Sequence, residues 1–293
     1  MELAVIILLW LIFWSLGSIL IIRYAKMETL SFSEIFRKSY CPKCKKPLSR
    51  KEQIPLLSFC IQKWKCRQCK KTISRLYLFL EIWTVVLFVL LYGFLHKQGR
   101  DVLGFWLLTG WSLFLMSLYD ILYYEIHIPL LVFSSILLLI AFMVGIFDRY
   151  ALWWGLWLFL LFLFIYVISY FYVKVKYKVN AEWLWLGDVI MSPYLGTLLF
   201  TGVSNYNAEY LFFYILFFLI LTGIIGILFF IIQNKVLKKK ADFLDNDEME
   251  DNTLPLIPAM ILSTVIMLVF QTSLYDWAIY LFDGFLERIF PNL

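Results

Sequence analysis

The fold class is decided by the stretch LYLFLEIWTVVLFVLLYGFL, which runs from Leu76 to Leu95 and contains one charged side chain, Glu81. A helix of about 20 apolar residues is about 30 Å long, which matches the hydrocarbon core of a bilayer. The stretch lacks the alternation of polar and apolar residues that a membrane β-strand requires. It therefore predicts a membrane-spanning helix.

The rest of the chain has the same character. Of its 293 residues, 62% are hydrophobic and 16% are charged, against about 45–50% and about 25% in soluble domains. This composition excludes soluble, disordered and nucleic-acid-binding classes despite the net charge of +5. We expect an all-α polytopic membrane protein with about eight transmembrane helices, at 3–23, 76–95, 102–121, 128–147, 151–172, 183–203, 209–233 and 254–271.

The placement of Lys and Arg predicts the orientation of these helices. With the N-terminus outside, 22 of the 26 basic residues fall in the cytoplasmic segments 23–75, 122–127, 173–182 and 234–252. The opposite topology would invert this ratio, against the positive-inside rule. We therefore expect both termini outside and the segment 24–75 in the cytoplasm.

Four parts follow from this topology. Residues 1–23 are expected to be a transmembrane anchor helix, since the apolar run is too long for a signal peptide. Residues 24–75 form a small cytoplasmic insertion between the first two helices, and 76–271 a transmembrane domain. Residues 272–293 read as a short amphipathic tail along the outer interface.

The cytoplasmic insertion contains four of the five cysteines, in the pairs Cys41-Pro-Lys-Cys44 and Cys66-Arg-Gln-Cys69. Two thiolates in a C-x2-C pair can reach one ion, and two such pairs can supply the tetrahedral four-thiolate site of a zinc ribbon. The alternatives are two disulfides, which a reducing cytoplasm disfavours, or free cysteines that only pack. The spacing predicts a structural zinc site with no open position for catalysis.

Acidic residues at membrane depth are costly, and they are functional candidates for that reason. Asp120 closes the third predicted span and Asp188 lies near the start of the sixth. Those spans run in opposite directions, so both aspartates should lie at the cytoplasmic boundary, at similar depth. Each could instead cap a helix or reach the interface.

Two such carboxyl groups on different helices can form a catalytic dyad. Close like charges cannot both ionise, so one carboxylate can activate water while the other, protonated, donates to a carbonyl oxygen. Gly187, beside Asp188, would permit close approach of a substrate or helix. Glu81, a turn into the second span, is expected to have a supporting role.

Together these features resemble the prepilin peptidases, the membrane aspartic proteases of type IV pilus and type II secretion systems. The resemblance rests on the two cysteine pairs, on Ile54-Pro-Leu-Leu-Ser58, on Ile73-Ser-Arg75 and Tyr77 through Glu81, on the two aspartates, and on Leu254-Pro-Leu-Ile-Pro258 before the last span.

The resemblance implies that the domain 76–271 is an aspartic peptidase domain in a bacterial cytoplasmic (inner) membrane. Such enzymes cut the basic leader from prepilins and pseudopilins at the cytoplasmic face, and many also methylate the new N-terminus with S-adenosylmethionine. Asp120 and Asp188 match the catalytic aspartates, and Cys41, Cys44, Cys66 and Cys69 match the zinc ligands. One departure is Trp185, which stands where the family's Gly-x-Gly-Asp motif has its first glycine.

Two other functions fit parts of the sequence. A proton-coupled membrane transporter could use the same acids as a relay, but both acids lie near one face and no inverted repeat is visible. A non-enzymatic zinc-ribbon membrane scaffold would explain the cysteines and leave the aspartates unexplained.

Overall fold

The structure is a computed structural model of the whole chain. It describes residues 9, 12–13, 15–23, 40–41, 44–49, 62, 65–97, 99–177, 186–201, 208–232, 256–270 and 280. The chain divides into two compact units, Met1–Leu115 and Met116–Leu293, and each is described by itself. The predicted tail 272–293 lies outside the described residues except for Tyr280, and so does the whole segment 24–39.

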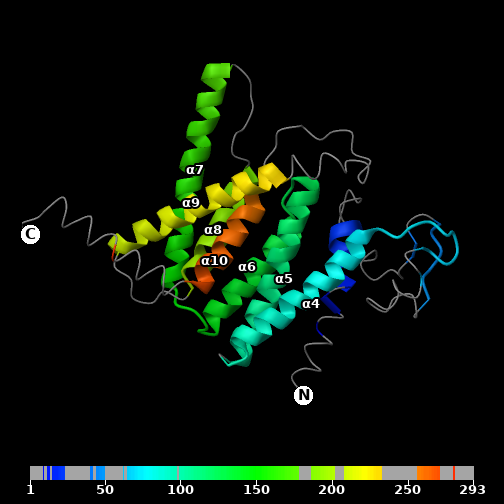
Figure 1. Cartoon of the computed structure of the whole chain (residues 1–293). Helices are drawn as coiled ribbons and strands as arrows, with labels where there is room; N and C mark the ends of the chain where they lie inside the picture. The colour runs from blue at the N-terminus through cyan, green and yellow to red at the C-terminus, as the bar shows by residue number, and fades with distance from the viewer. Residues whose placement is uncertain are drawn as a thin grey trace, which may run out of the picture. The chain divides into compact units, whose positions relative to one another are not determined.

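The described elements are helical, as the composition predicts (Figure 1). They are η1 (Ile19–Arg23), α4 (Arg75–Leu95), α5 (Arg100–Tyr123), α6 (Ile128–Met143), α7 (Tyr150–Tyr177), α8 (Leu186–Leu199), α9 (Ala208–Ile232) and α10 (Leu256–Val269). Extended backbone in the described residues is limited to two isolated bridges, Tyr40 with Pro47 and Lys65 with Thr72.

The first unit is held by aromatic packing between the N-terminal helical segment, α4 and the first part of α5. The ring of Phe13 lies 4.8 Å from that of Trp111 and 6.1 Å from that of Phe88. The indole N–H of Trp111 also donates to the backbone oxygen of Phe13 at 3.1 Å. Because an indole N–H inside a membrane has no water to bond, this contact fixes the position of the N-terminal segment on α5.

The second unit is organised around α8, which packs against both α7 and α10, while α10 also packs against α9. Ten of the fourteen residues of α8 are buried. Gly155 of α7 and Gly196 of α8 make the closest approach, since a Cβ built on Gly196 would lie 3.1 Å from the Cα of Gly155. Small residues at such crossings let helix backbones meet in the absence of a hydrophobic driving force.

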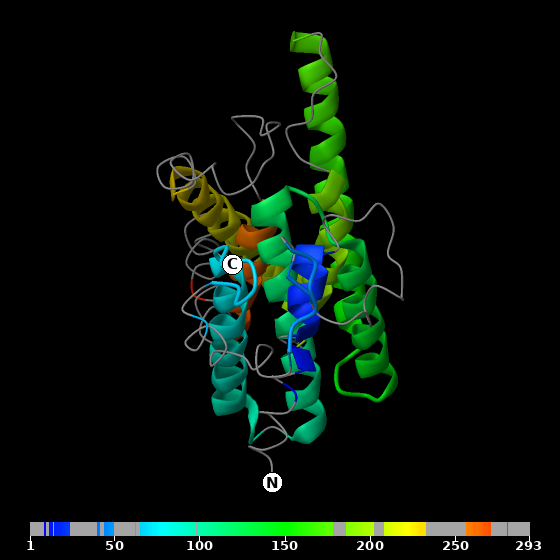
Figure 2. The ribbon, with the colours of Figure 1, turned by 90° about the vertical axis from the view of Figure 1, so that its right-hand side faces the viewer.

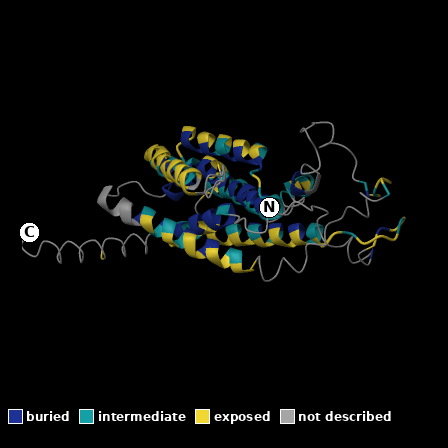
Figure 3. Cartoon of the chain, turned by 90° about the horizontal axis from the view of Figure 1, so that it is seen from above, coloured by how far each residue is buried: buried dark blue, intermediate teal, exposed yellow. Residues whose placement is uncertain are grey.

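Four helices are long and apolar enough to cross a membrane: α4, α5, α7 from Tyr150 to Lys176, and α9 from Tyr214 to Ile232. Apolar residues face outward along them, as Figure 3 shows by the exposed positions on the helices. In the second unit the C-terminal turns of α7 extend past α8 (Figures 1 and 2). This outward apolar surface identifies lipid as the solvent of these helices.

The other helices are shorter than the spans predicted for them. Helices α6, α8 and α10 have 16, 14 and 14 residues. The predicted span 128–147 in fact ends at Met143, because Gly145 adopts a φ of 80°. The N–H of Ile146 donates to the oxygen of Ala141 at 2.9 Å and the N–H of Gly145 to that of Phe142 at 3.2 Å. This is a Schellman motif, which stops a helix whatever the hydropathy of the residues that follow.

Candidate functional site

The four cysteines predicted as metal ligands come together in the first unit. Their sulfur atoms all lie within 4.8 Å of one another, and the Sγ atoms of Cys41 and Cys69 are 3.9 Å apart. Cys41, Cys44, Cys66 and Cys69 are free thiols, with no disulfide between them. Cys60 lies outside the described residues.

Each cysteine pair lies in a turn with the same backbone hydrogen bonds. The N–H of Cys41 donates to the oxygen of Lys46, and the N–H of Lys45 donates to the oxygen of Cys41. The second turn repeats this pattern, with Cys66, Lys70 and Lys71 in the places of Cys41, Lys45 and Lys46. The fourth residue after the first cysteine has a positive φ in both turns, 56° at Lys45 and 59° at Lys70. The two turns are therefore two copies of one ligand-presenting structure.

The geometry and the chemistry of this cluster suit zinc. A tetrahedral site with Zn–S bonds of about 2.3 Å places its sulfur atoms about 3.8 Å apart, close to the spacing seen here. Backbone hydrogen bonds from Cys69 and Gln68 lower the pKa of Cys66 to about 7, which favours the thiolate that binds metal. The pKa of Cys44 is raised to about 11, because burial and the other three thiols outweigh a hydrogen bond from the backbone of Lys46. A thiol surrounded by other thiols loses its proton readily only when a bound cation stabilises the thiolate.

The two aspartates also come together, in the second unit. Asp120 in the last turn of α5 is 6% exposed, and Asp188 in the first turn of α8 is 4% exposed. Their carboxyl groups are close enough for the charge of Asp188 to act on Asp120. The carboxyl group of Asp120 accepts a hydrogen bond from the backbone of Ile257, at the start of α10. Three helices that are far apart in the sequence thus meet around one pair of carboxyl groups.

One oxygen of Asp120 is left for another partner. Its Oδ2 atom is buried and has no hydrogen-bond partner among the residues that the structure describes. A buried oxygen without a partner costs free energy, and such atoms concentrate where a ligand or water is to bind. The carboxyl pair therefore offers an acceptor for a reacting group.

The turn after Asp120 is fixed by local hydrogen bonds. Tyr124 has a φ of 55°, and its N–H donates to the oxygen of Asp120 at 2.9 Å, which ends α5. His127, which is fully buried, caps α6 by accepting the N–H of Leu130 on Nδ1 at 3.2 Å. A backbone N–H can only donate, so this nitrogen carries no proton and the imidazole is neutral. The ring of Tyr119 lies 4.9 Å from that of His127.

Gly187 lets this turn approach α8 closely. A Cβ at that position would lie 3.1 and 3.2 Å from two carbons of Ile126 and 4.0 Å from Ile257. Ile126 follows the turn after Asp120, and Ile257 bonds Asp120. The absence of a side chain on Gly187 therefore allows Ile126 and Ile257 to pack beside Asp188.

A proline inside α8 is compensated one turn after Asp188. Pro193 has no N–H to donate to the oxygen of Val189. The hydroxyl of Ser192 donates to that oxygen instead, at 2.8 Å, and both residues are buried. This bond keeps the first turns of α8, and with them Asp188, helical.

Glu81 does not belong to this unit. It is 1% exposed on α4, in the first unit with the four cysteines, and its supporting role stays a prediction. Trp185, the departure from the family motif, lies outside the described residues.

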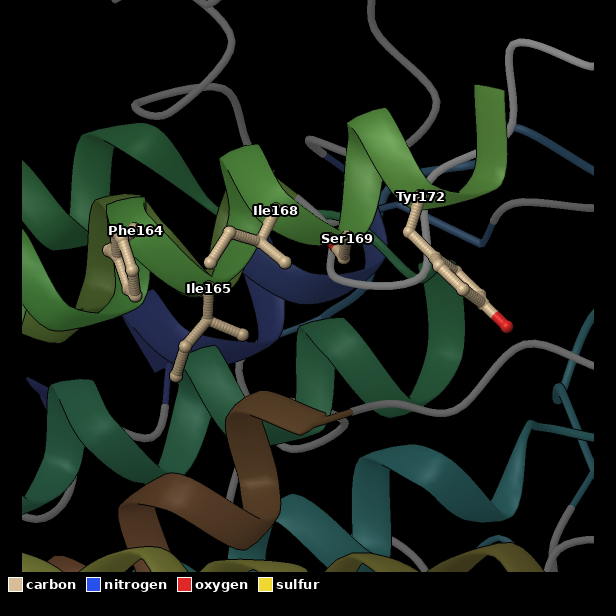
Figure 4. Close-up of a pocket in the computed structure, with 5 residues that line it drawn as sticks. All are labelled: Phe164, Ile165, Ile168, Ser169 and Tyr172. Carbon is tan, nitrogen blue, oxygen red and sulfur yellow. The ribbon is translucent and has the colours of Figure 1, made fainter. Parts of the chain in front are cut away.

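An open depression in the second unit is not lined by the aspartates. It is lined by residues of α7 alone: Phe164, Ile165, Ile168, Ser169 and Tyr172 (Figure 4). Four of these side chains are 40–62% exposed, and none is a carboxylate, imidazole or thiol. The depression is suited to a lipid chain and carries no chemistry of its own.

Sequence reasoning missed two parts of the aspartate site. It did not identify the backbone of Ile257 as a donor to Asp120, although prolines at 255 and 258 mark the start of a helix, where N–H groups are unpaired. It also did not single out His127, which is the buried N-cap of α6 in the structure.

Comparisons with known proteins cover the N-terminal part of the chain. The family model described as the bacterial peptidase A24 N-terminal domain matches residues 8–95. A prepilin leader peptidase/N-methyltransferase of Klebsiella pneumoniae is 37% identical over 83 residues, which are 28% of this chain and 36% of that protein. A protein of the same name from Bacillus subtilis (strain 168) is 44% identical over 59 residues, which are 20% of this chain and 24% of that protein. Another from Aeromonas salmonicida (strain A449) is 36% identical over 84 residues, which are 29% of this chain and 28% of that protein.

These matches span only 24–36% of the length of the three relatives, and no solved structure matches the chain. The matched region contains the four cysteines and α4, the helix that follows them. The N-terminal part of the chain, residues 8–95, therefore matches the prepilin leader peptidase/N-methyltransferase family, peptidase A24.

Proposed function

We propose that the chain is an intramembrane aspartic endopeptidase that removes the basic leader from type IV prepilins or pseudopilins at the cytoplasmic membrane face. The observation that carries this proposal is the pair of buried, interacting carboxyl groups of Asp120 and Asp188. A pair of buried carboxyl groups is costly to a membrane protein, and peptide hydrolysis is a reaction that such a pair can perform.

The reaction needs one proton shared between the two carboxyl groups. The ionised group takes a proton from a water molecule, whose oxygen attacks the carbonyl carbon of the scissile peptide. The protonated group donates to the carbonyl oxygen. Collapse of the tetrahedral intermediate breaks the C–N bond, and the proton taken from water passes to the departing amine. No covalent enzyme intermediate is required.

The proposed topology brings the substrate to this pair. Eight spans with both termini outside place the cysteine segment and the carboxyl pair at the cytoplasmic face of a bacterial inner membrane. A prepilin has its basic leader on that side and its hydrophobic helix in the lipid, so the peptide bond between them lies at the depth of the aspartates.

The cysteines have a structural role in this proposal. Cys41, Cys44, Cys66 and Cys69 would hold one zinc ion, which crosslinks the two turns and leaves no position for a water nucleophile. The relatives are named as N-methyltransferases as well as leader peptidases. Transfer of a methyl group from S-adenosylmethionine to the new N-terminus is a second proposal for this chain, and it rests on those names alone.

The test is cleavage of a purified prepilin by purified protein in lipid nanodiscs, followed by mass spectrometry. We expect wild-type protein to release the leader, and Asp188→Asn to release none while remaining folded. Asp101→Asn, an exposed aspartate on the same helix as Asp120, is the matched control and should cleave normally. Adding S-adenosylmethionine should raise the mass of the cleaved product by one methylene group. Full cleavage by Asp188→Asn, or proton flux without cleavage, would refute the peptidase.

A further inference from the structure

The surface around the four-cysteine cluster is strongly basic. Lys45, Lys46, Lys65, Lys70 and Lys71 are all exposed there. The described residues of this segment, 40–41, 44–49 and 65–74, include no Asp or Glu. We call this segment the cysteine ribbon. The hydrolysis proposed for the two aspartates does not use this charge.

The ribbon is joined to the membrane by a very short connection. Helix α4 begins at Arg75, capped by Ser74, and its 21 residues are about as long as the hydrocarbon core is thick. Thr72, which pairs with Lys65 in the second turn, is three residues before Arg75. Three residues span at most about 10 Å. The second turn, with Lys70 and Lys71, must therefore lie at the level of the lipid headgroups.

The first turn is held at the same place by the thiols. The sulfur atoms of the two turns lie within 4.8 Å of one another, so Lys45 and Lys46 cannot move far from the second turn. The cations of both turns consequently stay within about one Debye length of the headgroups, where surface charges act on one another.

The ribbon's charge exceeds what the metal site requires. Four thiolates and one Zn²⁺ carry two net negative charges, which two of the five lysines would balance. The remaining positive charge has no acidic partner among the described ribbon residues. A basic leader peptide would be repelled by this surface, whereas an anionic lipid surface would attract it.

We propose that the cysteine ribbon lies against the membrane and binds anionic phospholipid headgroups through Lys45, Lys46, Lys70 and Lys71. In this arrangement the ribbon is bound to lipid at the membrane surface, and its positive charge repels the basic leader. The proposal does not depend on the peptidase activity.

The test is lysine footprinting of the full, zinc-loaded chain in nanodiscs. The discs contain either phosphatidylcholine alone or phosphatidylcholine with phosphatidylglycerol, and a water-soluble amine reagent reports the rate at which each lysine is modified. We expect phosphatidylglycerol to slow the modification of each of the four ribbon lysines by about fivefold. This factor corresponds to about 1 kcal/mol of attraction for one lysine near an anionic surface. High salt should restore the rates. Lys97, at the other end of α4, is the single-cation control and should be slowed less.

A charge variant gives the second measurement. In Lys70→Gln with Lys71→Gln, the remaining lysines Lys45 and Lys46 should lose most of their lipid-dependent protection, while the zinc content stays at one ion. Equal modification rates in both kinds of disc would overturn the proposal. Protection by an added basic leader peptide, and not by phosphatidylglycerol, would also overturn it and would identify the ribbon as a leader-binding surface.

Discussion

The cysteine ribbon and the aspartate pair are both clusters of ionisable side chains, but they are assembled in opposite ways. The ribbon is made of two short turns with the same hydrogen bonds, each complete within six residues. The aspartate pair needs the end of α5, the first turn of α8 and the backbone at the start of α10. A local structure can be recognised from a short match, whereas a site built by distant helices depends on packing along the whole unit. The family model that matches the chain covers residues 8–95, the part that contains the cysteine ribbon.

The largest expected effect is the loss of zinc from the cysteine ribbon, which should leave the aspartate region folded. Cys41→Ser with Cys44→Ser should reduce zinc from about one ion per chain to none, because two ligands cannot hold the ion against a chelator. Metal analysis of the purified protein measures this. The helices of the second unit should stay folded, since their packing does not involve the cysteines. Zinc retained at full occupancy would show that these thiols are not its ligands.

The next effect concerns the approach of the Asp120 turn to α8. Gly187→Ala places a Cβ 3.1 Å from a side-chain carbon of Ile126, so Ile126 must move by a few tenths of an ångström and disturb the packing of the turn beside Asp188. We expect cleavage to fall about tenfold, because small displacements of catalytic groups are costly. The control is Gly223→Ala in α9, where a Cβ meets nothing within 4 Å and the rate should not change. Equal rates for both variants would mean that Gly187 does not set the spacing.

A smaller effect tests the support of α8 below Asp188. Ser192→Ala removes the hydroxyl that donates to the oxygen of Val189, so a buried carbonyl loses this hydrogen bond, at a cost of about 1–3 kcal/mol in the free energy of unfolding. Ser263→Ala is the matched control on α10. Its hydroxyl donates to Ala259, an oxygen in a regular helix without a proline at the fourth residue after it. Thermal unfolding in detergent should therefore show the larger loss for Ser192→Ala.

The cysteine ribbon and the aspartate region differ in how much of their structure the sequence predicts. Hydropathy predicted 76–95 for the helix found at Arg75–Leu95, because composition alone decides where an apolar helix crosses lipid. It predicted a span to residue 147 where α6 ends at Met143, because the backbone at Gly145 decides that end. The four cysteines followed from their spacing, since each turn contains its own ligands.

The predicted topology gave the depth of the two aspartates, and they were identified from that depth. The residues that contact them in the structure could not be identified in the same way. The bond from Ile257 to Asp120 joins residues 137 positions apart, and nothing in either local sequence specifies it. The packing of Ile126 on Gly187 is likewise set by where the helices cross. Such contacts follow from tertiary structure and have no local sequence signal.

The smallest effect tests the repeated turn of the ribbon. Lys45 and Lys70 adopt positive φ values of 56° and 59°, a conformation that costs a residue with a side chain about 1 kcal/mol relative to glycine. Lys45→Gly should therefore slow zinc loss to a chelator by a few fold. Lys46→Gly, one residue later and without a positive φ, should not. Faster zinc loss from Lys45→Gly than from the wild type would show that the positive φ of Lys45 does not destabilise the zinc-bound turn.

The central claim is that Asp120 and Asp188 act as one catalytic unit, and a double-mutant cycle of leader cleavage tests it most directly. Residues that act as a unit are strongly non-additive. We predict that Asp120→Asn and Asp188→Asn each lower the rate at least about a thousandfold, and that the double variant is no slower than either single variant. A double variant slowed by the product of the two single effects, or a single variant that still cleaves at the wild-type rate, would contradict the account.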